Sequence, residues 1–293
     1  MELSLIHREH VTNLKIKKTC PFSAVLQNAV YSNSMVGSIL LLYLIIVNNL
    51  NTKINQMKKI FICSIFLCFA CQNSNVISLT KVEGSPLYED AKLILNNNFF
   101  ETEAGYSFSF ALENYKLGVQ TSKDFEYQLA NSAKGQHIHF IINNGPYSAK
   151  YSGDFVQELE PGNNVVLAFL SRSYHESVKN ENAYYLNQIG DGNKKDLSKE
   201  LLFYSRPKGV YKGEDTDRIL LDFYLINTHI GPEGNKVKAT IQGSEFIIDE
   251  WAPYYIEGLP KGEISIKLEL INSKGDLIES PFNASLRTVI LEE

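Results

Sequence analysis

The sequence predicts an all-β protein, in which two tandem immunoglobulin-like β-sandwiches follow an N-terminal signal and lipidation segment. Three observations lead to this prediction. Residues 81–200 and 201–293 match each other in register, and short strand patterns separated by turn signals recur through both halves. Neither half contains a long apolar stretch with the helical period of about 3.6 residues. We therefore assign the first sandwich to 81–200 and the second to 201–293.

The internal repeat holds on both sides of one insertion. Residues up to 118 match residues 113 positions later, and residues from 137 onward match residues 100 positions later, so the first copy carries 13 extra residues around 121–136. The matched residues are apolar, aromatic or turn-forming, as expected of one structural unit used twice. The pairs include Phe110 and Phe223, Leu112 and Leu225, Asn114 and Asn227, Ile141 and Ile241, Tyr151 and Trp251, Gly162 and Gly262, and Val166 and Ile266.

Within each copy, local patterns indicate short strands joined by tight turns. Apolar and polar residues alternate over 264–270, as in a strand with one buried face. Turn-forming combinations of Asn, Gly and Asp lie at 143–145, 162–163 and 274–276. Units of about a hundred residues with this strand spacing favour immunoglobulin-like sandwiches. Only residues 182–202 leave a short helix or a linker open.

The charge distribution separates an N-terminal segment from an acidic body. Residues 1–71 contain seven Lys and Arg against two Glu, which leaves 21 basic and 31 acidic residues in the remainder. Such a body lacks the clustered cations that phosphate contacts need, so we expect no nucleic-acid partner. The cysteines all fall within residues 1–71, which excludes disulfides, thiolate metal sites and a cysteine nucleophile from the body. They are Cys20, Cys63, Cys68 and Cys71.

Residues 57–71 have the organisation of a lipoprotein signal peptide. Lys58 and Lys59 precede ten apolar residues, a run too short to span a bilayer, and Ala70 precedes Cys71, which would carry the lipid. The two residues before Ala70 depart from the small or aliphatic residues usual there. Residues 72–80 then form a tether. This pattern predicts a cell-envelope location, periplasmic or at the outer membrane, with attachment to the membrane through Cys71.

Residues 1–56 do not fit a signal peptide that starts at a true N-terminus. We expect translation to begin at Met57, and the upstream segment to be a mis-called or disordered extension. A second short apolar run over 39–47 leaves the alternative of a membrane hairpin if the upstream segment is translated.

Three segments carry a resemblance to a known family: Gly-Gln-His-Ile-His at 135–139, Ala-Phe-Leu-Ser-Arg-Ser-Tyr-His-Glu-Ser at 168–177, and Leu-Phe-Tyr-Ser-Arg-Pro-Lys-Gly at 202–209. They resemble uncharacterised Gram-negative envelope lipoproteins with immunoglobulin-like domains, some of which bear the automatic name "phosphopeptide-binding protein". The resemblance covers about residues 85–291. It implies an exported β-sandwich protein and no established activity.

Residues 171–175 offer one physical basis for phosphopeptide binding. The run from Ser171 to His175 is similar to the Ser-Arg-x-His motif with which forkhead-associated domains read phosphothreonine, but it has one residue more before the His. No Gly-Arg partner motif accompanies it. The candidate ligand-binding residues of this patch are Ser171, Arg172, Ser173, His175 and Glu176. Arg206, in a second Ser-Arg pair, is a further candidate for gripping an anion, although exposed solubilising charge is the commoner role.

A His-x-His pair supplies the candidate metal site. Side chains two apart on a strand share a face, so His137 and His139 place two imidazoles together, and His175 follows the next predicted strand and could complete a copper or zinc site. The repeat aligns the pair with Val237 and Ala239, which predicts a core-facing orientation. A register slip of one residue would instead give that face to Ile138, Phe140 and Ile142. Two hydrogen-bonded structural histidines are the alternative to a metal.

Enzyme signatures are missing from the sequence, which has no Gly-rich phosphate loop, no Gly-x-Ser-x-Gly elbow and no His-Glu-x-x-His. We therefore expect a non-enzymatic envelope lipoprotein that binds a ligand, protein or peptide through its first sandwich. The inserted loop around 121–136 enters directly before His137, so it could join the histidines and residues 172–176 in one patch. Copper or zinc binding and phosphopeptide binding are the alternative functions.

Overall fold

The computed structural model describes residues 42–43, 45–50, 76–126 and 128–293. The chain divides into two compact units, Met1–Asn73 and Ser74–Glu293. In the first, residues 42–43 and 45–50 are helical. Among the described residues, no helix is both long and apolar enough to cross a membrane. The predicted signal segment, Cys71 and the start at Met57 lie outside the described residues and stay predictions.

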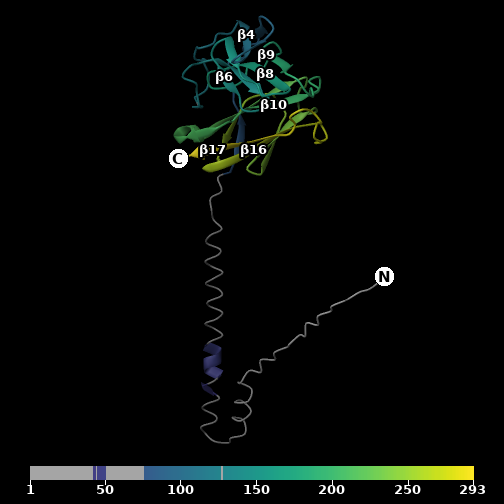
Figure 1. Cartoon of the computed structure of the whole chain (residues 1–293). Helices are drawn as coiled ribbons and strands as arrows, with labels where there is room; N and C mark the ends of the chain where they lie inside the picture. Colours follow the sequence, from purple (N-terminus) through teal and green to yellow (C-terminus); the bar gives the residue numbers. More distant parts are fainter. Residues whose placement is uncertain (1–41, 44, 51–75, 127) are drawn as a thin grey trace, which may run out of the picture. The chain divides into compact units, whose positions relative to one another are not determined.

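The second unit consists of strands in four sheets and confirms the all-β prediction (Figure 1). The first copy contributes one sheet of β2 (Lys92–Leu95), β4 (Gly105–Glu113), β3 (Phe100–Thr102) and β7 (Asp154–Gln157), and another of β6 (Ser148–Lys150), β5 (His137–Ile142), β8 (Asn164–Ser171) and β9 (Tyr184–Ile189). The second sandwich has one sheet of β1 (Ser78–Lys81), β15 (Tyr254–Glu257), β12 (Arg218–Ile226) and β10 (Leu201–Arg206). Its other sheet consists of β11 (Val210–Lys212), β17 (Ser285–Glu292), β16 (Gly262–Ile271), β13 (Lys236–Ile241) and β14 (Ser244–Ile248). A short 3-10 helix, η1 (Gly213–Thr216), follows β11.

The two copies repeat the same strand pairings. In the first copy β4 pairs with β2 and β7, and in the second β12 pairs with β10 and β15. Likewise β8 lies between β5 and β9, and β16 lies between β13 and β17. Even the left-handed turn residues correspond, because Asn114 and Asn227 both have positive φ, as do Gly162 and Gly262. The sequence repeat is therefore also a repeat of topology.

The register between β5 and β13 differs by one residue from the sequence alignment. Ile138 pairs with Leu170 in the first copy, and Val237 pairs with Leu270 in the second. The position equivalent to Val237 is therefore Ile138, and the histidines on either side of it take positions that Lys236 and Lys238 occupy in the second copy. The predicted core-facing orientation of His137 and His139 is wrong, because a one-residue slip turns a strand over.

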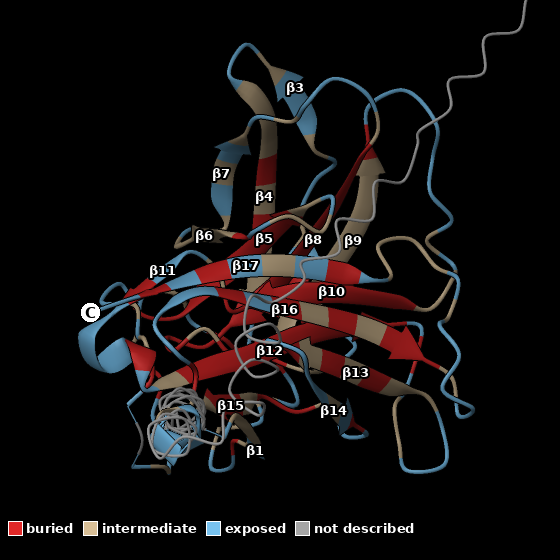
Figure 2. Ribbon diagram, turned by 90° about the horizontal axis from the view of Figure 1, so that it is seen from below, coloured by how far each residue is buried: buried red, intermediate tan, exposed pale blue. Residues whose placement is uncertain are grey.

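The four sheets stack as layers with three apolar interfaces between them. Ile138, Phe140 and alternate residues of β8 pack against β4 in the core of the first sandwich. The opposite side chains of β8, with Ile141, pack against β10 and β12 of the second copy. The other faces of β10 and β12 pack against β13, β16 and β17. Figure 2 shows β10 and β12 buried along nearly their whole length, because both faces of the two middle sheets are covered.

Two smaller predictions about segments are also wrong. The range 72–80 overlaps β1, which pairs with β15 and so joins the second sandwich although it precedes the first in the chain. The range 182–202 contains β9 rather than a helix, since Tyr184–Ile189 completes the sheet beside β8. Both segments depend on pairing with strands distant in sequence, which local pattern does not report.

Candidate metal centre

The face of β5 that turns away from the first sandwich core carries His137 and His139, and the second copy covers it. Both side chains are fully buried. The loop after β8 folds back over them and brings His175 to the same place, with a positive φ of 70° at that residue. This loop is closed by mutual backbone hydrogen bonds between Arg172 and residues 175–176. The structure thus brings together the three histidines predicted from the sequence.

The ring nitrogens of the three histidines converge on one point. His137 Nε2 lies 3.0 Å from His139 Nε2 and 3.1 Å from His175 Nδ1. All three donor atoms lie within 4.8 Å of one another. Nitrogen ligands about 2.0–2.1 Å from a tetrahedral metal ion are separated by roughly 3.3 Å, so the two spacings from His137 are close to those around a nitrogen-ligated copper or zinc ion.

Hydrogen bonds fix which nitrogen of His137 is free to bind. Its Nδ1 lies 2.8 Å from the carbonyl oxygen of Gly135, which can only accept, so Nδ1 carries the proton and Nε2 presents a lone pair to the cluster. An orienting hydrogen bond from the other ring nitrogen to a backbone carbonyl is the usual support of a metal-ligating histidine.

Hydroxyl groups surround the other two imidazoles. Ser171 Oγ lies 3.0 Å from His139 Nε2, and Ser205 Oγ of β10 lies 3.2 Å from His139 Nδ1. The Tyr147 hydroxyl lies 3.1 Å from His175 Nδ1, and its ring stacks on His139 with centroids 3.4 Å apart and planes 10° from parallel. A hydroxyl can donate or accept, so these groups can satisfy the imidazoles in the metal-free protein and orient them when a metal is bound.

Burial keeps the cluster neutral at physiological pH. Desolvation lowers the pKa of His137 to about 4, and it lowers the pKa values of His139 and His175 well below 6.5. The nearby cations Arg206 and Lys208 lower all three pKa values further. Neutral imidazole is the form that ligates a metal, so protons compete little for these nitrogens near pH 7.

The predicted anion-binding arginine of this loop is used internally. Arg172 is 2% exposed, its Nη1 lies 3.0 Å from Glu176 Oε1, and it also donates to the carbonyls of Ser177 and Pro86. Glu176 accepts a further hydrogen bond from Ser85. Within the described part of the chain this guanidinium is neutralised, so phosphopeptide recognition through Arg172 would require breaking a buried ion pair. That function stays a prediction.

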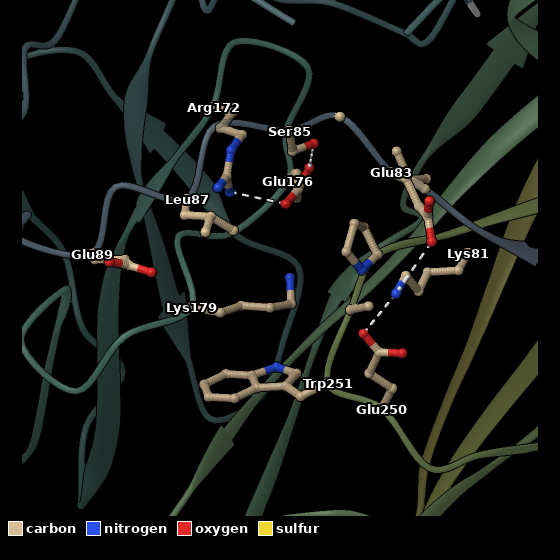
Figure 3. A pocket seen from close by; sticks show the side chains of 14 residues that line it. Lys81, Glu83, Ser85, Leu87, Glu89, Arg172, Glu176, Lys179, Glu250 and Trp251 are labelled. Atoms are coloured by element: carbon tan, nitrogen blue, oxygen red, sulfur yellow. Dashed lines mark hydrogen bonds and ion pairs between the residues drawn. The ribbon is translucent and has the colours of Figure 1, made fainter. Parts of the chain in front are cut away.

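A cleft of about 440 Å³ lies over the Arg172–Glu176 pair (Figure 3). Figure 3 shows Lys179 above Trp251 and, across the cleft, Lys81 held between Glu83 and Glu250. Lys179 Nζ is paired with the fully buried Asp222 at 2.6 Å. Acidic and basic side chains are interspersed around the cleft, so the lining has no dominant sign of charge. Trp251 is half-buried and donates to the carbonyl of Phe223, in agreement with a packing role.

The inserted loop packs beside the cluster without joining it. Thr121 and Ser173 hydrogen-bond each other through backbone and hydroxyl groups, and Ser132 bonds Tyr151, whose ring lies 5.1 Å from that of His137. Ser173 therefore anchors this loop. By the register of β5 against β13, the insertion is one residue longer than predicted.

Three residues around the cluster, Tyr147, Ser205 and Lys208, were not predicted from the sequence as parts of the site. Ser205 and Lys208 come from the second copy, which packs on the histidine face. A signal for this packing is present in the sequence, because Val-Val-Leu-Ala-Phe-Leu at 165–170 and Leu-Leu-Phe-Tyr at 201–204 are continuous apolar runs, typical of strands covered on both faces.

No protein-family model matches the chain, and no curated protein matches it. Three solved structures show weak similarity. Fibronectin(III)-like modules of Clostridium thermocellum CbhA share 9% identity at a TM-score of 0.25, covering 69% of this chain and 94% of that one. SGBP-B of the Bacteroides ovatus mixed-linkage glucan utilization locus was solved with a mixed-linkage heptasaccharide. It shares 10% identity with this chain at a TM-score of 0.20, and the match covers 69% of this chain and 70% of that one. Domains 4 and 5 of the S-layer protein SbsC share 11% identity at a TM-score of 0.18, and the match covers 72% of this chain and 100% of that one. Similarities this low carry no argument about ligand or function.

Proposed function

We propose that this protein is a non-enzymatic binding protein of the cell envelope that holds one copper or zinc ion in the cluster of His137, His139 and His175. The observation that carries the proposal is the meeting of three neutral imidazoles, two fully buried and that of His175 partly buried. The Gly135 carbonyl fixes the lone pair of His137 on Nε2. Anchoring through Cys71 stays part of the proposal on the strength of the sequence pattern alone.

The donor set favours some metals over others. Three imidazoles suit copper and zinc, whereas calcium and magnesium prefer oxygen ligands. Three protein ligands leave a fourth coordination position for water or another small ligand. The Tyr147 hydroxyl, near His175 Nδ1, and the Ser171 hydroxyl, near His139 Nε2, could hydrogen-bond such a ligand. Binding of a metal ion is the function that this donor set supports.

Metal titration of the purified full chain tests the proposal. After treatment with a chelator, the chain should bind one equivalent of Cu(II) or Zn(II) that is absent from His137→Gln, His139→Gln and His175→Gln, measured by calorimetry and elemental analysis. Electron paramagnetic resonance of the Cu(II) form should show coupling to nitrogen ligands.

His229→Gln is the matched control, because this exposed histidine lies outside the cluster. His7 and His10, in the part of the chain that the structure does not describe, can add weak binding that all variants share. Metal content that stays the same in the His137 and His175 variants as in the wild-type chain would exclude the proposal.

A further inference from the structure

Arg206, at the end of β10, has a buried guanidinium without a carboxylate partner among the residues that the structure describes. The residue is 6% exposed, and its Nε has no hydrogen-bond partner. Its Nη1 donates to the Tyr211 hydroxyl at 2.9 Å, and its other neighbours are the rings of Tyr147 and Tyr211. Arg172, in the Ser-Arg pair of the first copy, differs in this respect because Glu176 neutralises it.

Two further cations lie near Arg206, and in the described residues neither has a carboxylate partner. Lys208 donates to the carbonyl of Tyr147 at 2.7 Å and lies 3.9 Å from the centre of that ring. Arg287 donates to the carbonyls of Asn144 and Gly145. Burial, and to a smaller extent the charges of Arg206 and Arg287, lowers the pKa of Lys208 to about 8.

This arrangement is costly without an anion. Buried charges in proteins are normally paired, and an unpaired one loses hydration without a compensating contact. The hydrogen-bond partners of these cations are carbonyl oxygens and a hydroxyl, and their ring partners are tyrosines. The one carboxylate opposite Arg206 in the strand pairing, Asp222, is paired with Lys179. A guanidinium with an unbonded Nε–H can donate to an oxyanion, and an ammonium group near the same Tyr147 ring adds a second positive charge.

We propose that Arg206 and Lys208, next to the histidine cluster and separated from it by the Tyr147 ring, bind a small oxyanion such as inorganic phosphate or sulfate. This site goes beyond the proposed metal function and does not depend on it, because the cations are present whether or not a metal is bound. Arg287, whose Cζ lies 4.5 Å from the centre of the Tyr204 ring, adds positive charge near the site.

Calorimetric titration of the metal-free full chain with sodium phosphate, and separately with sodium sulfate, tests the site. Ionic strength is held constant with sodium chloride, so that general salt effects cancel. The expected result is saturable binding of one anion per chain. Arg206→Met and Lys208→Met should each weaken it by at least about tenfold, since a hydrogen bond to a charged group contributes about 1.5–3 kcal/mol.

Lys212→Met is the matched control, because that lysine is 69% exposed and pairs with Glu292 on the surface. Lys208 is only half-buried, so its variant keeps the test valid if Arg206→Met fails to fold. Three results would overturn the site: no saturable binding, equal affinity in both variants and the wild type, or binding of a phosphothreonine peptide but not of inorganic phosphate. Because no metal is present, failure here is distinct from failure of metal binding.

Discussion

Acidification from pH 7 to pH 5 should destabilise the metal-free protein, because unfolding lets the histidine cluster take up protons that the folded state excludes. Burial lowers the pKa of folded His137 to about 4, whereas an unfolded histidine titrates near about 6.5. Between these values the unfolded state binds more protons. The free energy of unfolding is therefore highest above about pH 6.5 and falls as the pH drops toward about 4.

The magnitude follows from the two pKa values. A difference of about 2.5 units corresponds to roughly 3 kcal/mol for His137 alone, at about 1.36 kcal/mol per unit. Near pH 5.5 an unfolded histidine is about nine-tenths protonated, so His137 contributes a slope of about 1.2 kcal/mol per pH unit. The lowered pKa values of His139 and His175 add slope of the same sign.

Urea unfolding at a series of pH values measures this slope. Trp251, the single tryptophan of the chain, lies edge-on to Tyr224 between the two copies and reports unfolding by its fluorescence. His137→Gln should reduce the slope near pH 5.5 by about 1.2 kcal/mol per pH unit, whatever its effect on absolute stability. A flat wild-type profile between pH 7 and pH 5.5, or an unchanged slope in His137→Gln, would refute the reasoning.

Three further predictions concern ligand binding and packing. Zn(II) at a free concentration about a hundred times its dissociation constant should raise the free energy of unfolding by about 2.7 kcal/mol in urea titrations, and His175→Gln should abolish this gain. Arg172→Ala should cost about 3–5 kcal/mol in the same assay, because it leaves the buried Glu176 carboxylate unpaired; a cost below about 1 kcal/mol would contradict that pairing. Gly153→Ala should lower the free energy of unfolding by about 1–3 kcal/mol, since the added Cβ would clash with the Phe110 carbonyl oxygen of β4. Its control is Gly231→Ala, which should unfold at nearly the wild-type urea concentration because open space surrounds that position.

The repeat made most of the fold predictable from the sequence. β4 and β12 have bounds separated by the offset that the apolar pairs indicate, and so do β7 and β15. These segments are predictable because alternating side chains and turn glycines are local signals. The assignment of β1 to the second sandwich was not, since pairing with β15 joins residues far apart in the chain and leaves no local mark in Ser78–Lys81.

The candidate site was predictable in part, for a physical reason. The types and spacing of His137 and His139 indicated shared orientation, and the loop position of His175 indicated proximity. The alignment did not reveal which face of β5 packs in the core of the first sandwich. Ile138 and Phe140, on the face opposite the histidines, are apolar and suit a core, and a shift of one residue exchanges the two faces of the strand. The second-copy residues Ser205 and Lys208 depended on how the sandwiches pack.

The stacking of the copies explains why the histidine face of β5 is buried whereas the equivalent face of β13 meets water. The outer face of β13 and β16 meets water, and there Lys238 forms an ion pair with Glu269 at 3.1 Å, which Lys267 also contacts at 2.9 Å. The equivalent face of β5 carries His137 and His139 and lies beneath β10. Burial removes water as a partner, so charged lysines become costly on this face while neutral imidazoles can be satisfied by hydroxyls, a carbonyl or a metal. One unit used twice thus acquires two environments, and the buried one is where imidazole ligands can be held rigid and neutral.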